Sequence, residues 1–344
     1  MYLTSNNEPI FYNSEELFLS IYLIGYETQG ESIVLIFETE ERKAVWSAVI
    51  DSYSLPEKNI TDNILKAYKF GQNKKIDLAC ITHFHNDHTT GFKNLLEYYA
   101  DENTKIMMPE FSREYYEAQG HYPAKEIRDY IQRKYTGGSN CHDNNVFYNR
   151  KIDRNLIWDF NGSTHGVGHQ LYIESLLPTD RRALHYIDDD LSRHSPNDLS
   201  LMLKIVFDGN QYLFTGDCTN DEMKDLGAND FYTRQTNTTP HVVYLKIPHH
   251  GSKTADNLLK MVEDDRLIID KIATCTYDYR ATKENIIEGY RKKCDIAMTK
   301  DINAKASNAH SHGIIKYVFD SRGNIIDEKT LFSGNATRLW RKVK

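Results

Sequence analysis

Three histidines and one aspartate lie within six positions of the chain, in the segment 81–91. His83 and His85 are two residues apart, so in an extended segment their side chains point the same way. Asp87 and His88 follow where the chain would turn towards a helix. Because divalent cations such as zinc bind this mixture of imidazole and carboxylate, the spacing predicts a loop from which all four side chains converge as metal ligands.

This motif resembles the signature of the metallo-β-lactamase-fold superfamily. The resemblance implies an α/β fold of four layers, the αββα sandwich, in which two packed sheets carry helices on their outer faces. It also implies a site for one or two metals at one edge of the sheets. The companion residues of the superfamily come in a fixed order, and the chain contains candidates for them.

The first companion is an aspartate at the end of an early strand. The apolar run 44–50 predicts a strand, and it closes on Asp51. The superfamily places a carboxylate there that orients metal-bound groups from behind, and such partners fix the tautomer and geometry of the ligands. An ordinary turn aspartate would look the same, but its place ahead of the histidines favours the supporting role for Asp51.

A strand, a hairpin turn and a second strand follow later in the chain. The runs 201–207 and 211–217 flank an Asp-Gly-Asn turn, which is typical of a β-hairpin. The second run ends on Thr-Gly-Asp. The resemblance implies that Asp217 bridges two metals with one carboxylate oxygen on each. Gly216 would let the backbone pass close to that site.

The third histidine of the first metal has several candidates. His194 lies at about the distance before the bridging aspartate that the superfamily shows. Some branches carry Asn-x-x-Ser in this place instead, and Asn197 and Ser200 fit that variant as well. His165 and His169 are further alternatives. We assign His194 to the metal and leave the other readings open.

The last companion is a Pro-His-His-Gly turn after the apolar run 242–247. The resemblance implies that one histidine binds the second metal and that the other faces the substrate. We assign His250 as the metal ligand and His249 as a hydrogen-bond donor or acid in the transition state, and the reverse assignment stays open. Asp87 would bind the second metal and orient the nucleophile.

Further motifs resemble one branch of the superfamily, the soluble relatives of the C-terminal metallo-hydrolase domain of the bacterial DNA-uptake competence channel. Apolar runs flank a turn with Gly30-Glu31-Ser32, where the branch has Gly-Asp-Ser, and the Asn-x-x-Ser, Thr-Gly-Asp and Pro-His-His-Gly-Ser motifs are shared. The likeness covers about residues 16–320 with gaps. The late histidine loop of the branch has no clear match, and His310 and His312 are candidates to replace it.

The length of the chain predicts one catalytic domain with insertions. The chain has 344 residues, more than a core of roughly 200–250 residues requires. We therefore expect a single domain over 1–344. The segment 101–165 is predicted to be a partly helical insertion beside the mouth of the metal site, where long functional loops belong.

Composition indicates a cytoplasmic protein without a membrane anchor. No run approaches the ~20 apolar residues of a membrane span, and no basic region precedes an apolar core at the start of the sequence. Five scattered cysteines suit a reducing compartment. The net charge of −7 argues against a broad nucleic-acid-coating surface. It does not exclude a nucleotide substrate, because two bound cations would dominate the local field.

The sequence therefore predicts a binuclear metal-dependent hydrolase, with zinc as the expected metal and manganese as the second choice. A metal-bridging hydroxide would attack a phosphodiester in nucleic acid or a nucleotide, so the protein would be a phosphodiesterase or nuclease. Asp87, His249 and Asp51 are the expected catalytic residues. One alternative is hydrolysis of a carbon ester, thioester, lactone or lactam. Another is a non-catalytic sensing module with the same fold.

Overall fold

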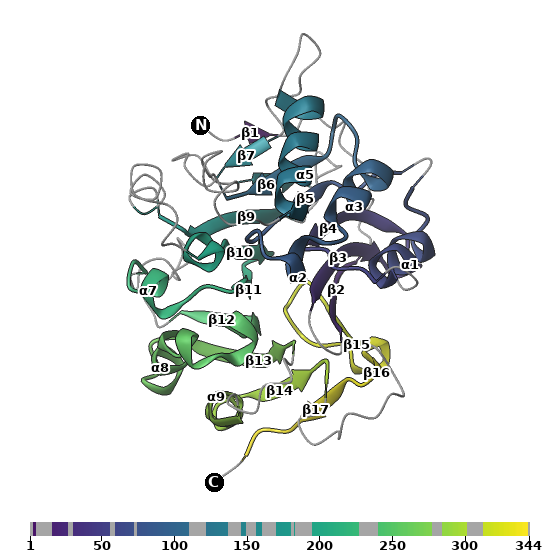
Figure 1. Cartoon of the computed structure of the whole chain (residues 1–344). Coiled ribbons are helices and arrows are strands. Elements are labelled where there is room, and N and C mark those ends of the chain that lie inside the picture. The colour runs from purple at the N-terminus through teal and green to yellow at the C-terminus, as the bar shows by residue number, and fades with distance from the viewer. Residues whose placement is uncertain are drawn as a thin grey trace.

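Two β-sheets packed face to face organise the protein (Figure 1). The computed structural model describes residues 3–4, 16–26, 30–55, 59–71, 74–109, 122–136, 146–148, 156–159, 170–179, 182, 195–226, 240–276, 284–300 and 312–342. Within these residues, the first sheet, sheet A, has nine strands and the second, sheet B, has eight.

Sheet A takes its strands mainly from the second half of the chain. In spatial order they are β1 (Leu3–Thr4), β8 (Leu156–Asp159), β9 (Gln170–Leu177), β10 (Met202–Phe207), β11 (Asn210–Phe214), β12 (His241–Lys246), β13 (Ile268–Cys275), β14 (Asp295–Met298) and β17 (Thr337–Leu339). The run from β11 to β14 is parallel, so the carboxyl ends of these strands lie at one edge.

Sheet B takes its strands mainly from the first half of the chain. In spatial order they are β16 (Leu331–Gly334), β15 (His312–Phe319), β2 (Leu17–Tyr26), β3 (Glu31–Thr39), β4 (Ala44–Ile50), β5 (Leu78–Cys80), β6 (Lys105–Met108) and β7 (Val146–Tyr148). The run from β4 to β7 is parallel, whereas β2, β3 and β4 pair antiparallel. The consecutive strands β16 and β17 belong to different sheets.

The two sheets bury their inner faces against each other. On β3, alternate residues such as Ile33, Leu35 and Phe37 point into this central core, together with Leu203 and Ile205 of β10. The residues between them point to the outer face, which is also buried. Both faces of the central strands are therefore apolar, as expected for a sheet covered on both sides.

Helices cover the two outer faces (Figure 1). The outer face of sheet B packs against helices from the first half of the chain, and that of sheet A against helices from the second half. The former are α1 (Ile60–Ala67), α3 (Phe92–Tyr99) and α5 (Tyr122–Ile131); the latter are α7 (Asn220–Met223), α8 (Asn257–Glu263) and α9 (Glu284–Arg291). The predicted four-layer αββα sandwich is confirmed.

Short helical turns complete the elements. They are α2 (Asn86–Thr89), the π-helical turn η1 (Gln132–Thr136) that continues α5, and the 3₁₀ turns η4 (Pro196–Leu199), η6 (Pro248–Gly251), η7 (Lys253–Ala255) and η8 (Asp327–Lys329). No helix in the described ranges is both long enough and apolar enough to span a membrane.

The predicted hairpin is present between β10 and β11. Its two loop residues, Asp208 and Gly209, have φ angles of 48° and 85°, as a type I′ turn requires. The second strand ends at Phe214, three residues earlier than the sequence pattern indicates, because Gly216 takes a φ of 50° and turns the chain away from the sheet. That turn delivers Asp217 to the edge where the candidate site lies.

Candidate metal centre

The predicted ligands meet at one edge of the sandwich. The carboxyl ends of β4 and β5 lead to Asp51 and to the loop with His83, and those of β11 and β12 lead to Asp217 and to the two histidines that follow. Parallel pairing within each sheet sets these ends side by side. Side chains from both sheets can therefore face the same point.

Four donor atoms surround that point, and we call them the four-donor cluster: Asp87 Oδ2, His88 Nε2, Asp217 Oδ2 and His250 Nε2. His88 Nε2 lies 3.9 Å from Asp87 Oδ2 and 3.6 Å from Asp217 Oδ2. His250 Nε2 lies 3.9 Å and 3.3 Å from the same two oxygens. In a tetrahedral site with donor–metal distances of about 2.1 Å, donors are about 3.4 Å apart, so this spacing suits a single cation.

One buried polar atom in the site supports the same interpretation. His88 Nε2 is buried and has no hydrogen-bond partner within the described part of the chain. Buried polar atoms are nearly always satisfied, so an atom of this kind points to a bound ion or water. The donor set of two imidazoles and two carboxylates fits a divalent metal.

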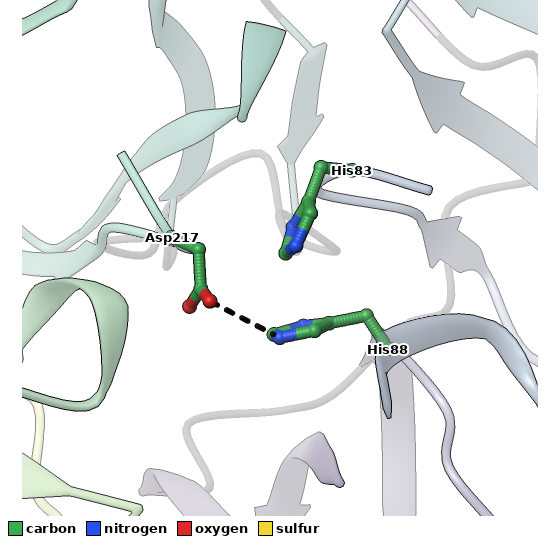
Figure 2. Close-up of side chains that lie close together, drawn as sticks. All are labelled: His83, His88 and Asp217. Atoms are coloured by element: carbon green, nitrogen blue, oxygen red, sulfur yellow. Dashed lines mark ion pairs between the residues drawn. The ribbon is translucent and has the colours of Figure 1, made fainter. Parts of the chain in front are cut away.

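His83 and His85 form a second group of donors beside the first. His83 Nε2 and His85 Nδ1 are 3.0 Å apart, and the ring of His83 lies 4.1 Å from that of His88 between centroids. One donor atom each from His83, His88 and Asp217 falls within a 4.8 Å cluster (Figure 2). The His83–His85 pair therefore offers two further imidazoles beside the four-donor cluster.

Asp51 fixes the orientation of His88 from behind. The Asp51 carboxylate accepts hydrogen bonds from His88 Nδ1 at 2.7 Å, from Thr82 Oγ1 at 2.6 Å and from the Thr82 backbone N–H at 2.7 Å. This contact keeps a proton on His88 Nδ1, so Nε2 is the nitrogen that would face a bound cation. Thr82 lies next to His83, so one carboxylate organises both ligand groups.

The two adjacent histidines occupy a strained turn. His249 and His250 have φ angles of 45° and 50°, a left-handed conformation that costs roughly 1–2 kcal/mol for each such residue. The turn is held by the His249 backbone N–H, which donates to Gly216 O at 3.2 Å. The side chain of His250 is 10% exposed and that of His249 is 25% exposed. The geometry thus turns His250 inward and leaves His249 nearer the solvent.

Charge in the site is balanced between acids and imidazoles. Burial alone would raise the pKa of Asp217, but His250, His88 and His249 face its carboxylate and hold that pKa well below its usual value. Burial opposes a charge on His88, yet Asp217, Asp51 and Asp87 raise the pKa of His88 well above its usual value. Burial, together with His88, keeps the pKa of His83 well below normal, so His83 is a neutral donor.

The structure brings together eight of the residues that the sequence singled out. Asp51, His83, His85, Asp87, His88, Asp217, His249 and His250 share the site, and their roles as ligands or catalytic groups stay predictions. His194, proposed as the third histidine, lies outside the described residues, as do His165, His169 and His310. His312 is on β15 and lines a cavity under α1 with Tyr22 and Tyr68.

The Asn-x-x-Ser alternative does reach the site. Ser200 Oγ accepts a hydrogen bond from the Asp217 backbone N–H at 3.0 Å, so this hydroxyl fixes the backbone that carries the aspartate. Asn197 is buried, and its Nδ2 lies 3.4 Å from His249 Nε2. Both residues of the Asn-x-x-Ser motif therefore contact residues of the candidate site, independently of His194.

Three residues of the site were missed by sequence reasoning. Lys246 and Glu31 form a fully buried ion pair of 2.9 Å, and Thr276 Oγ1 lies 2.6 Å from His250 Nδ1. Burial disfavours a charge on Lys246, but Glu31 and Asp217 overcome this and raise the pKa of Lys246. A lysine inside the apolar run 242–247 was the available signal, since a charge within a buried strand needs a partner.

The segment 101–165 is described only in part. Its helix α5 packs against α2 and α3, and α2 carries Asp87 and His88. This part of the segment therefore adjoins the ligand loop. The wider prediction of an insertion within a single domain stays a prediction.

The fold has distant likenesses among solved structures. The metallo-β-lactamase fold protein YhfI from Bacillus subtilis aligns at 10% identity over 82% of this chain and 96% of that chain, with a TM-score of 0.39. A HARLDQ-motif mutant of a metallo-β-lactamase from Cronobacter sakazakii aligns at 11% identity over 63% and 74%, with a TM-score of 0.32. No protein-family model and no curated protein matches the sequence.

Proposed function

We propose that the protein is a metal-dependent hydrolase that holds two divalent cations. The observation that carries this proposal is the four-donor cluster, in which Oδ2 of Asp217 lies 3.6 Å and 3.3 Å from the Nε2 atoms of His88 and His250. The His83–His85 pair would hold the second cation. Zinc suits the imidazole-rich donors, and manganese is the alternative because carboxylates contribute.

Bound cations supply Lewis-acid charge and acidify a water molecule towards neutral pH. The residues around them then divide the remaining tasks. Asp87 reaches the cluster with a side chain that is 29% exposed, so it can orient an attacking water at the solvent side. Asp217 is almost fully buried and holds the two ligand groups together.

His249 is the proposed hydrogen-bond donor to the developing negative charge. Its Nε2 is 3.9 Å from Asp217 Oδ2, and its Nδ1 is 2.9 Å from Thr254 Oγ1. The ring is thus fixed at one nitrogen and turned towards the cluster with the other. A donor preorganised in this way stabilises a transition state without reorganising during the reaction.

The proposed substrate is a phosphodiester in nucleic acid or a nucleotide. If cations are held by the four-donor cluster and the His83–His85 pair, their charge would suit the anionic oxygens of such a group. The likeness to the competence-channel branch agrees with this choice and stays a prediction. We place the protein in the cytoplasm, where the buried free thiols of Cys80, Cys218, Cys275 and Cys294 would stay reduced.

The test is hydrolysis of bis(p-nitrophenyl) phosphate by protein loaded with Zn²⁺ or Mn²⁺. We expect turnover that a chelator abolishes and that Asp217→Ala removes. Asp264→Ala is the matched control, because the Asp264 side chain is 62% exposed and forms a surface ion pair with Arg266. Protein that binds two cations yet leaves this ester intact would redirect the search to carbon esters or to a sensing role.

A further inference from the structure

A buried ion pair joins the two sheets beside the four-donor cluster. Glu31 is the first residue of β3 in sheet B, and Lys246 is the last residue of β12 in sheet A. Both side chains are completely buried, and Lys246 Nζ lies 2.9 Å from Glu31 Oε1. Each member of this pair also contacts a different part of the candidate metal site.

Lys246 supports the aspartate of the cluster. Its Nζ donates a hydrogen bond to Gly216 O at 3.0 Å and lies 3.6 Å from Asp217 Oδ1. The ammonium thus holds both the peptide before Asp217 and one oxygen of its carboxylate. The other oxygen, Oδ2, faces the histidines. Turning the carboxylate out of its present plane would break the contact with Lys246, so the ammonium holds the plane in which the other oxygen faces the cluster.

Glu31 supports the histidine of the cluster through Thr276. The Thr276 hydroxyl donates its single proton to Glu31 Oε2. It must therefore accept at the 2.6 Å contact with His250 Nδ1, which makes that nitrogen the protonated one. His250 Nε2 then presents its lone pair to the cluster. Glu31 sets the tautomer of His250 through a hydroxyl, as Asp51 sets that of His88 directly.

We propose that Glu31 and Lys246 are positioning residues that hold the Asp217 carboxylate and the His250 imidazole in the orientation that metal binding requires. The proposal rests on the metal centre of the proposed function. It explains why two charges are buried here at all. A buried ion pair adds little stability compared with apolar side chains of similar volume, so its presence is better explained by what it orients.

The same strand supplies a matched control. Glu38 lies at the other end of β3, roughly 23 Å away at the usual rise per residue. It is also buried, and its Oε1 lies 3.5 Å from Nζ of the buried Lys316. Glu38→Gln therefore disturbs a buried glutamate–lysine pair on the same strand without touching the metal site.

The experiment measures Zn²⁺ affinity by competition with a chelator, and the absorption spectrum of bound Co²⁺, for the full chain and its variants. We expect Glu31→Gln to weaken binding of one metal about 10–100-fold and to change the Co²⁺ spectrum, as the loss of a supporting partner does. Glu38→Gln should bind both metals as the unmodified protein does. Equal affinities in the two variants would overturn the proposal.

A double variant separates positioning from folding. Glu31→Gln alone leaves the Lys246 charge unpaired, which can unfold the protein. Glu31→Gln combined with Lys246→Met removes both charges and should recover thermal stability without recovering metal affinity. Recovery of both would show that the pair only balances charge, and would overturn the proposal.

These readouts need no substrate, so they separate this inference from the proposed hydrolysis. Selective loss of metal in Glu31→Gln, in a protein that cleaves no ester, would support the positioning role and contradict the hydrolase. Protein that binds neither Zn²⁺ nor Co²⁺ would contradict both.

Discussion

The two halves of the metal centre are built in different ways. In the half that belongs to sheet B, four candidate ligands come from one loop, 81–91, and a single carboxylate, Asp51, supports it. In the half that belongs to sheet A, Asp217 and His250 follow separate strands, and their supports come from Glu31, Lys246 and Thr276. One half is continuous in sequence, and the other exists only when the sheets have packed.

Both halves nevertheless solve the same chemical problem. One ligand imidazole in each half directs an N–H towards a carboxylate, directly or through a hydroxyl, so that its second nitrogen faces the cluster. His88 reaches Asp51 directly at 2.7 Å, whereas His250 reaches Glu31 through the Thr276 hydroxyl. A direct contact with a carboxylate and a contact relayed through a hydroxyl can therefore orient an imidazole in the same way, provided that the carboxylate stays ionised.

The largest expected effect is on the rate of hydrolysis, and it should differ between the carboxylates of the two halves. Asp217 Oδ2 lies within 3.3–3.9 Å of Nε2 atoms in His88, His249 and His250, whereas the more exposed Asp87 reaches only two of these rings at 3.9 Å. We expect Asp217→Ala to lower phosphodiester hydrolysis roughly 10³-fold and Asp87→Ala about 10²-fold.

Metal content measured with the rates sharpens this test. Asp217→Ala should lose both cations, because its carboxylate serves both donor groups, and Asp87→Ala should lose one. A variant of Asp217 that keeps two cations and full activity would contradict the central role that we assign to this residue.

A second prediction compares direct and relayed support. Asp51→Asn suits the backbone, since Asp51 has a φ of 56° and asparagine also tolerates this region. The amide, however, would offer a donor to His88 Nδ1 and favour the wrong tautomer. We expect metal affinity to fall about 100-fold, and only about 10-fold in Thr276→Val, because Glu31 Oε2 itself lies 3.5 Å from His250 Nδ1. Chelator competition gives both values, and the reverse ranking would contradict the larger contribution that we assign to the direct support.

A third prediction concerns the backbone of the sheet A half. A Cβ on Gly216 would lie 2.5 Å from Ser200 Oγ and 2.9 Å from Thr82 Cβ, at a φ of 50°. We expect Gly216→Ala to lower the free energy of unfolding by roughly 2–4 kcal/mol. Gly209→Ala is the control, because its φ of 85° is equally unfavourable but nothing lies within 4 Å. That variant should lose only roughly 1 kcal/mol in urea titration, and similar losses in both would exclude a tight contact at Gly216.

The smallest expected effect is a pH dependence of stability, and it comes from Asp77 in the sheet B half. Burial raises the pKa of Asp77 to about 7, although the Ser47 backbone N–H donates to its carboxylate and opposes the shift. The folded state therefore binds this proton more tightly than the unfolded chain does. Stability is lost as the pH rises from about 4 to about 7, with a slope of at most about 1.4 kcal/mol per unit.

Asp77→Asn should remove this dependence, because asparagine can still accept from Ser47 but has no charge. We expect the variant to gain roughly 1–2 kcal/mol over the unmodified protein between pH 5 and pH 8, measured by thermal unfolding in matched buffers. Parallel pH profiles for the two proteins would show that Asp77 titrates normally.

The sequence predicted the fold class and candidate residues in both halves of the site. The sheet B half was the easier to predict. The ligand spacing from His83 to His88 lies in one loop, and the strand that ends at Asp51 is continuous and apolar, so local patterns carry the information. The supporting roles of Glu31, Lys246 and Thr276 were not predicted, although the sequence shows Glu31 in a motif turn and Lys246 within an apolar run. Their partners come from different strands and opposite sheets, and only packing brings a buried glutamate to a buried lysine.

The consecutive strands β16 and β17 link the two sheets through the backbone. They are joined by Asn335 and Ala336, yet β16 pairs with β15 in sheet B and β17 with β14 in sheet A. One short segment therefore covers an open edge of each sheet. The outermost strands at these two edges, β16 and β17, are short, and β17 carries Arg338. Short, charged edges resist pairing with other chains, so this segment protects both sheets from aggregation at once.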